Sequence, residues 1–242
     1  MLVAAAVCPH PPLLVPEATG AGAPDALAAE AEELDRLRAA CDAVVAGLLA
    51  SRPDLLVIVG GAARTADYPP EAAGGLRAYG VPFGVGSGEQ ILPLSLTIGR
   101  WLLDRAGAAP AGAAPAVLLR AVAFDAPPGD CAGLGARTSA LAERVAMLVM
   151  GDGPGRRARG APGKPDDDAD RFDAEVVKAL ADADTETLAA LDQARAQALF
   201  AAGRAAWQVL AGAAKPEATD GAVYYAAAPF AVSYYVASWR AR

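Results

Sequence analysis

Histidine is almost missing from this sequence, because His10 is the only one in 242 residues. A mononuclear iron or zinc site takes two or three His, Cys or carboxylate ligands. The single histidine therefore excludes, within one chain, the two-histidine, one-carboxylate iron site of non-haem oxygenases. Cysteine is also scarce: Cys8, Cys41 and Cys131 are far apart and form no CxxC pair. This spacing argues against a structural zinc site and predicts a reduced, cytoplasmic protein.

Long apolar runs and a basic charge balance are absent as well. No apolar stretch approaches the roughly 18 residues that a membrane-spanning helix needs, and the N-terminus lacks the positive charge of a signal peptide. The formal net charge of −7 disfavours a nucleic-acid partner, since such a partner requires a basic face. No GxSxG elbow, P-loop or GxGxxG is present, and we interpret the glycine-rich residues 84–89 as a turn.

What is present is the composition of a globular protein, with 54% hydrophobic and 20% charged residues. Apolar runs predict buried strands, and apolar residues at three- and four-residue spacing predict helices between them. Strands that alternate with helices predict an α/β fold, with a central, mostly parallel sheet flanked by helices, in a single domain over residues 1–242. The predicted strands are 2–7, 54–61, 114–125 and 147–152, and the helices between them are 24–52, 92–107 and 137–146.

Two long connections interrupt this alternation. A loop rich in Gly, Pro and Asp is predicted from the end of the second strand to about residue 90. Residues 153–170 exceed an ordinary connection in length, which indicates an active-site, lid or mobile loop. Two or three helices are predicted over residues 172–213, followed by two aromatic strands at 222–228 and 231–239.

Polar side chains follow three of the predicted strands. Because sites in open α/β sheets form beyond the carboxyl ends of the strands, we expect these side chains to converge on a ligand. Each also has a structural interpretation: a loop histidine can serve as a hydrogen-bonding group, Asp152 as a loop cap, and the arginines as solvated charge. The candidate ligand-binding residues are His10, Arg64, Asp67, Asp152, Arg156 and Arg157. His10 is also the one candidate acid or base, since an imidazole titrates near neutral pH.

Six stretches of the chain, in order, resemble the class III extradiol dioxygenase (LigB-like) superfamily, which includes the Memo-like proteins. The alanine-rich composition is similar to that of an actinobacterial branch. The resemblance covers nearly the whole chain and implies the LigB-like fold. The stretches are "VCPHPPLLVPE", "LLVIVGGAA", "LVMGDGPGRR", "FDAEVVKAL", "AAGRAAWQVLAGA" and "APFAVSYYVASW".

The resemblance also implies a ferrous ion held by two histidines and a glutamate (a cysteine in Memo-like proteins), with a further histidine as acid or base. The first ligand falls on His10. The second falls among residues 62–64, which are Ala62, Ala63 and Arg64 here, and the third falls on Ala202. The acid or base falls on Gly155. One ligand of three is therefore retained, and we expect no metal, because a single imidazole cannot hold Fe²⁺ against water.

Three classes of function stay open. The first is a catalytically degenerate pseudoenzyme that binds a small anionic or aromatic molecule at the strand ends. In it, Arg64 would replace the positive charge of the iron. The alternative role for Arg64 is a structural ion pair with Asp67 or Asp152. The second is an active extradiol oxidoreductase acting on a catecholic substrate, with Fe(II) at an atypical site. The third is a scaffold that forms a homodimer or pairs with a second, different chain through the aromatic C-terminal strands. A site filled by side chains such as Trp207 would favour the scaffold.

Overall fold

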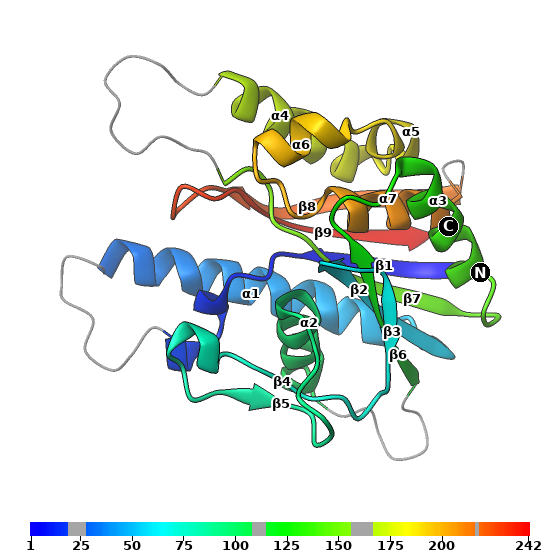
Figure 1. The fold of residues 1–242 in the computed structure, drawn as a ribbon. Coiled ribbons are helices and arrows are strands. Elements are labelled where there is room, and N and C mark those ends of the chain that lie inside the picture. Colours follow the sequence, from blue (N-terminus) through cyan, green and yellow to red (C-terminus); the bar gives the residue numbers. More distant parts are fainter. Residues whose placement is uncertain (19–27, 108–114, 156–166, 216–217) are drawn as a thin grey trace.

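Strand β1 (Leu2–Cys8) lies near the middle of a seven-stranded sheet with the order β3-β6-β2-β7-β1-β9-β8. The protein is described from a computed structural model, in which residues 1–18, 28–107, 115–155, 167–215 and 218–242 are described. Figure 1 shows the sheet edge-on between two layers of helices. The strands of the sheet are β1, β2 (Leu55–Ala62), β3 (Ala66–Tyr68), β6 (Ala116–Ala123), β7 (Val145–Met150), β8 (Thr219–Ala227) and β9 (Tyr234–Ala241).

The four central strands are parallel, because β2 pairs in parallel with β6 and β7, and β7 with β1. Antiparallel strands complete both edges: β3 folds back on β6, and the β8–β9 hairpin adds to β1. This arrangement confirms the predicted α/β class with a mostly parallel central sheet. It also brings the carboxyl ends of β6, β2, β7 and β1 to one edge of the molecule.

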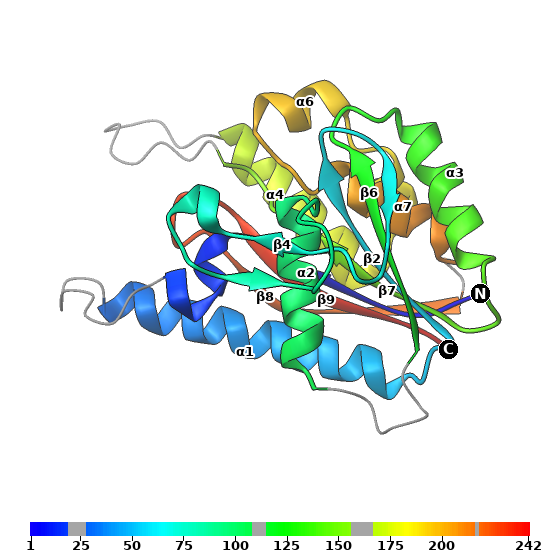
Figure 2. The ribbon, with the colours of Figure 1, turned by 60° about the horizontal axis from the view of Figure 1, so that its bottom comes forward.

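The helices cover both faces of the sheet, as Figures 1 and 2 show. On one face, α1 and α2 pack on the central strands, and on the other lie α3, α4, α5, α6 and α7. Among the described residues, none of the helices combines the length and apolar character that a membrane crossing requires. The helices are α1 (Ala28–Ala50), α2 (Leu94–Arg105), α3 (Pro128–Ser139), α4 (Asp167–Asp182), α5 (Thr185–Ala189), α6 (Gln193–Ala198) and α7 (Arg204–Ala213).

The helix predicted at residues 137–146 lies earlier in the chain. Helix α3 begins at Pro128, a favoured first position, and it ends at Ser139, before a turn that leads into β7. The glycines of α3 are typical of a loop in sequence, but in the structure they allow α3 to pack closely against α7. A Cβ at Gly135 would lie 2.0 Å from the carbonyl oxygen of Val209 in α7. The two helices therefore approach more closely than larger residues would allow.

Both stretches predicted as long connections contain regular structure. The stretch up to residue 90 contains β3, a small sheet of β4 (Gly74–Gly75) and β5 (Gly84–Val85), and a 3-10 helix at Arg77–Tyr79. The predicted turn in residues 84–89 is therefore partly strand. The last residues of the predicted loop 153–170 belong to α4, which begins at Asp167, and residues 156–166 of this loop lie outside the described residues. Four helices occupy the region for which two or three were predicted.

The aromatic side chains of the C-terminal strands divide between core and surface. Tyr234, Tyr235 and Trp239 of β9 are buried, and Trp239 donates a hydrogen bond to the carbonyl of Leu180. On the edge strand β8, Tyr224 is exposed. The aromatic residues of β9 therefore serve mainly to pack the helices against the sheet.

Candidate functional site

The candidate site lies beyond the carboxyl ends of β1 and β7, which end side by side at Cys8 and Met150. The chain leaving β7 stays bonded to the chain leaving β1, because Gly151 N donates to Cys8 O at 2.9 Å. The backbone N–H of His10 then donates to Asp152 Oδ1 at 2.7 Å. The structure thus brings together two of the residues that the sequence placed at neighbouring strand ends.

The His10 side chain is almost entirely buried, with 6% of its surface exposed. Its Nδ1 lies 3.6 Å from Asp152 Oδ1, which is too far for a hydrogen bond, and Nδ1 has no other partner among the described residues. Burial raises the pKa of the neighbouring Tyr234, and the negative charge of Asp152 raises it further. Within the described ranges, Asp152 therefore lies near an imidazole and a neutral phenol and forms no ion pair with an arginine.

The segment after β7 is fixed by backbone hydrogen bonds to two distant parts of the chain. Gly153 N donates to Ser233 O at 2.8 Å, and Ser233 N donates to Pro154 O at 2.9 Å. Gly203 N donates to Asp152 O at 2.8 Å. These bonds hold the start of α7, and with it Ala202, against the strand ends.

The other predicted site residues do not join His10 and Asp152. Asp67 lies on β3, and because this strand folds back along β6, its carboxylate meets Arg120, with both oxygens accepting hydrogen bonds at 2.6 Å. Arg64 is exposed and makes no ion pair within the described ranges. The predicted pairing of Arg64 with Asp67 or Asp152 is not formed. Arg156 and Arg157 lie outside the described residues.

A hollow of about 240 Å³ lies beside Ala202, at the carboxyl ends of β6 and β2, and we call it the aromatic hollow. The rings of Phe124 and Phe200 line it and are 49% and 61% exposed, although large apolar side chains are usually buried. A Cβ at Gly61 of β2 would lie 2.4 Å from the Phe124 ring and 3.1 Å from Ala202 O. The lining residues are Phe124, Asp125, Gln193, Ala196, Gln197, Phe200, Ala201, Ala202 and Arg204.

Arg204 lines the inner wall of the aromatic hollow while only 2% of it is exposed. Its Nη1 donates to Ala126 O at 2.7 Å and to Gln208 Oε1 at 2.8 Å, and its Nη2 donates to Phe124 O. All of these acceptors are neutral, and none of the described carboxylates forms an ion pair with it. Burial lowers the pKa of Arg204, and the charges of Asp125 and Asp192 act in the opposite direction without forming an ion pair with it.

Arg204 was not among the site residues predicted from the sequence. The available signal was its position in a helix of Ala, Trp, Val and Leu, in which a charged residue has no solvent-facing neighbours. A charge on such a helix is buried only if it is paired or serves a ligand. The glutamines of the hollow, Gln193 and Gln197, carried no signal of their own.

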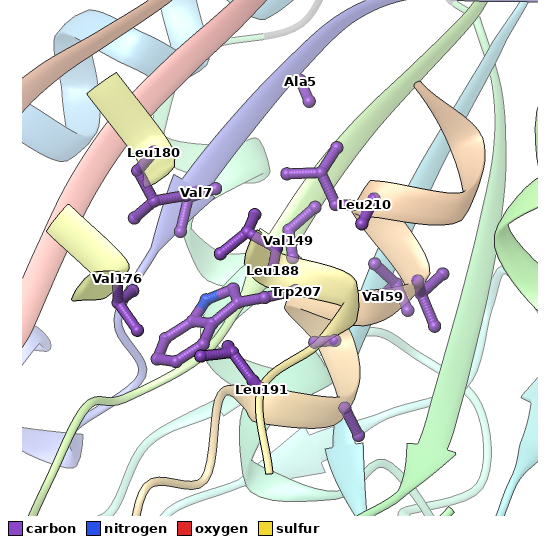
Figure 3. Packing of buried hydrophobic residues seen from close by; sticks show 14 of the residues in the cluster. Ala5, Val7, Val59, Val149, Val176, Leu180, Leu188, Leu191, Trp207 and Leu210 are labelled. Atoms are coloured by element: carbon purple, nitrogen blue, oxygen red, sulfur yellow. The ribbon is translucent and has the colours of Figure 1, made fainter. Parts of the chain in front are cut away.

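Trp207 does not fill the hollow. Figure 3 shows its indole in the core between the sheet and the helices, near Val7, Val149, Leu188 and Leu191. It is fully buried and lies against Tyr235, with ring centroids 5.7 Å apart. At the predicted site, beside Asp152, the indole does lie close: a Cβ at Gly151 would be 2.8 Å from its Nε1. The scaffold alternative therefore stays a prediction.

The donor atoms near the strand ends do not fit the ferrous ion that the resemblance implies. The described chain contains no group of three His, Cys, Asp or Glu side chains that could hold a metal. Ala62, Ala63 and Ala202 carry methyl groups where ligands would be needed. Of the two donors present, the Asp152 carboxylate is already engaged by a backbone N–H. Such a set offers too few donors to replace the water bound to iron.

The fold defines the chain as an α/β protein built on a mixed seven-stranded sheet. It is similar to the crystal structure of the uncharacterized protein JW3007 from Escherichia coli K12, with a TM-score of 0.54 and 11% sequence identity. The match covers 98% of this chain and 99% of the other. No protein-family model matches the sequence, and no curated protein matches it. At this identity the likeness shows the fold alone.

Proposed function

We propose that this chain binds a small aromatic molecule with one anionic group in the aromatic hollow, and that it does so without a metal. The observation that carries the proposal is Arg204, a buried guanidinium that meets only neutral acceptors and lines a hollow between two exposed phenylalanine rings. The rings supply an apolar face for a planar ligand, and the guanidinium supplies the charge that a carboxylate requires.

The energetics favour an anion over a neutral ligand of the same shape. A buried charge without an ion-pair partner is costly, and the more distant carboxylates Asp125 and Asp192 offset only part of this cost before the ligand arrives. A carboxylate that reaches the guanidinium offsets it, whereas a neutral amide does not. Asp125 also lines the hollow, but its side chain is exposed, so solvent screens its repulsion of the ligand.

The size of the hollow limits the ligand to about one ring. Benzoate is a suitable probe, with about nine non-hydrogen atoms that each contribute roughly −0.5 kcal/mol, which gives a dissociation constant of the order of 0.5 mM. The hollow adjoins the strand ends where the resemblance places the active site of the LigB-like superfamily. We propose that the chain belongs to this superfamily as a pseudoenzyme, in which the pocket is retained and the iron chemistry is lost.

The proposed location is the cytoplasm. The free cysteines Cys8, Cys41 and Cys131 are all buried, and burial raises the pKa of the Cys8 and Cys131 thiols. Thiols of this kind remain protonated and packed as small apolar groups. Buried thiols packed in this way are typical of proteins from a reducing compartment, which supports the proposed location.

The test is calorimetric titration of the purified protein with benzoate. Ala202→Leu should fill the hollow and weaken binding at least about tenfold, since the added side chain occupies the ligand's volume. Tyr79→Ala is the control. Tyr79 is an exposed aromatic residue, as Phe124 and Phe200 are, but it does not line the hollow. Equal affinity in the Ala202 variant and the parent protein would refute the proposal.

A further inference from the structure

A second hollow, of about 450 Å³, lies at the opposite end of the sheet, and we call it the basic hollow. It is formed where the amino end of β1 meets the carboxyl end of α1 and the last residues of β9. Three arginines line it: Arg144, Arg240 and Arg242. Such a concentration of positive charge is unexpected on a chain with a net charge of −7. The side chains of this hollow are therefore opposite in sign to the chain as a whole.

Arg240 is the least engaged of the three. It is an exposed residue of β9 that makes no ion pair or side-chain hydrogen bond within the described ranges. Its guanidinium lies against helix α1, where a Cβ at Gly47 would be only 2.8 Å from Nη2. Glycine at this position leaves room for the arginine to lie along the wall of the hollow.

The guanidinium of Arg144 also forms no ion pair within the described ranges, although Asp54 Oδ2 accepts from the Arg144 backbone N–H at 2.9 Å. Its Nη2 donates to Ser51 O at 2.5 Å and its Nε to Arg52 O at 3.0 Å, so its partners are carbonyls at the end of α1. Arg242 differs, because it is paired with Asp220 at 2.7 Å. Asp220 is the cross-strand neighbour of Arg240, and Arg242 already occupies its carboxylate. The guanidinium groups of Arg144 and Arg240 are therefore left without an ion-pair partner among the described residues.

We propose that the basic hollow binds the phosphate group of a small phosphate ester. A phosphate offers several oxygens to guanidinium forks, and its double charge matches the two arginines that lack an acidic partner. The hollow is larger than a phosphate group, which leaves space for an organic part beside Ala50 and Ser51. The site is independent of the aromatic hollow, since it shares none of its lining residues.

The experiment compares glucose 6-phosphate with inorganic phosphate by calorimetry in chloride buffer at constant ionic strength. Glucose 6-phosphate should bind more tightly, and Arg240→Met should weaken its binding by about tenfold or more. Arg77→Met is the matched control, because Arg77 is an exposed arginine in a 3-10 helix that does not line the hollow. Ala50→Glu is a second variant, which adds a negative charge to the wall, leaves the arginines in place and should also weaken binding.

The outcomes separate the claims. Equal affinity in Arg240→Met and in the parent protein, or no binding of either phosphate, overturns the site. Equal affinity for inorganic phosphate and glucose 6-phosphate overturns the claim that an organic part is bound. Ala202→Leu, which fills the aromatic hollow, should leave phosphate binding unchanged. The two proposals therefore fail or succeed separately.

Discussion

The backbone N–H of His10 and the carboxylate of Asp152 are joined by a 2.7 Å hydrogen bond across two parallel strand ends. The imidazole itself makes no such bond, since its Nδ1 lies 3.6 Å from the same oxygen. The pair therefore ties the β1 and β7 termini together through the main chain of His10. This role is structural, and it needs the carboxylate more than the imidazole.

Asp152→Ala should lower the free energy of unfolding by about 1–2 kcal/mol, because a partly buried N–H loses a charged acceptor. Asp152→Asn should recover much of this loss, because its side-chain oxygen can still accept. Urea unfolding followed by circular dichroism measures both variants. An alanine variant as stable as the parent would show that the bond contributes nothing.

Metal content should be far below one equivalent after anaerobic incubation with Fe²⁺, because the donor set near His10 is too small. His10→Ala should not change the value. Elemental analysis of protein purified without chelator measures this directly. Stoichiometric iron that disappears in His10→Ala would contradict the ligand assignment and restore the dioxygenase alternative.

Arg204→Met should separate charge recognition from shape recognition. Benzoate binding should fall by about tenfold or more, while the weaker binding of benzamide should persist, because only benzoate uses the guanidinium charge. Arg204→Lys, which keeps the charge, should retain part of the preference. If benzoate and benzamide lose affinity equally in Arg204→Met, the guanidinium serves only to hold the walls of the hollow.

Asp125→Asn should tighten benzoate binding about twofold, because it removes an exposed and therefore screened negative charge from the wall of the hollow. Benzamide is the control ligand, and its affinity should not change. Titration of the variant with both ligands measures the difference. Weaker benzoate binding in Asp125→Asn would indicate that the ligand's charge lies elsewhere.

Asp184 makes the stability depend on pH. Its carboxylate caps α5 by accepting from the backbone N–H and the hydroxyl of Thr187, and these hydrogen bonds lower its pKa. A carboxyl whose pKa is lower in the folded state stabilises the fold above its unfolded pKa, and loses this effect as pH falls through the folded value. Asp184→Ala should lower the free energy of unfolding by about 1 kcal/mol at neutral pH and by less in acid. Urea unfolding at neutral and at acidic pH measures this difference. A cost that does not vary with pH would rule out the carboxylate as its source.

The contact between His10 and Asp152 could be predicted from the sequence, because each residue follows a strand of a parallel sheet and such ends meet at one edge. The place of Asp67 could not. It depends on the three-residue strand β3, which is too short to show alternation and lies in a stretch rich in Gly and Pro. The antiparallel pairing of β3 with β6 decided that Asp67 meets Arg120.

Arg204 was missed, and α3 was placed too late in the chain, for a related reason. Whether a charge in an alanine-rich helix is buried depends on the face that packs, and the α3–α7 contact sets that face. The glycines of α3 lower its helix propensity, and only the close approach to α7 explains them. Tertiary packing, which local patterns do not encode, therefore determined the chemistry of the hollow.

The most direct test of the proposed ligand site is the crystal structure of the protein soaked with 4-bromobenzoate, with the bromine located by its anomalous signal. We expect one bromine between the rings of Phe124 and Phe200, with the carboxylate directed towards Arg204. The same protein treated with chelator should give the same result. Bromine bound elsewhere, or bound in the hollow only after iron is supplied, would contradict a metal-free site for an aromatic anion.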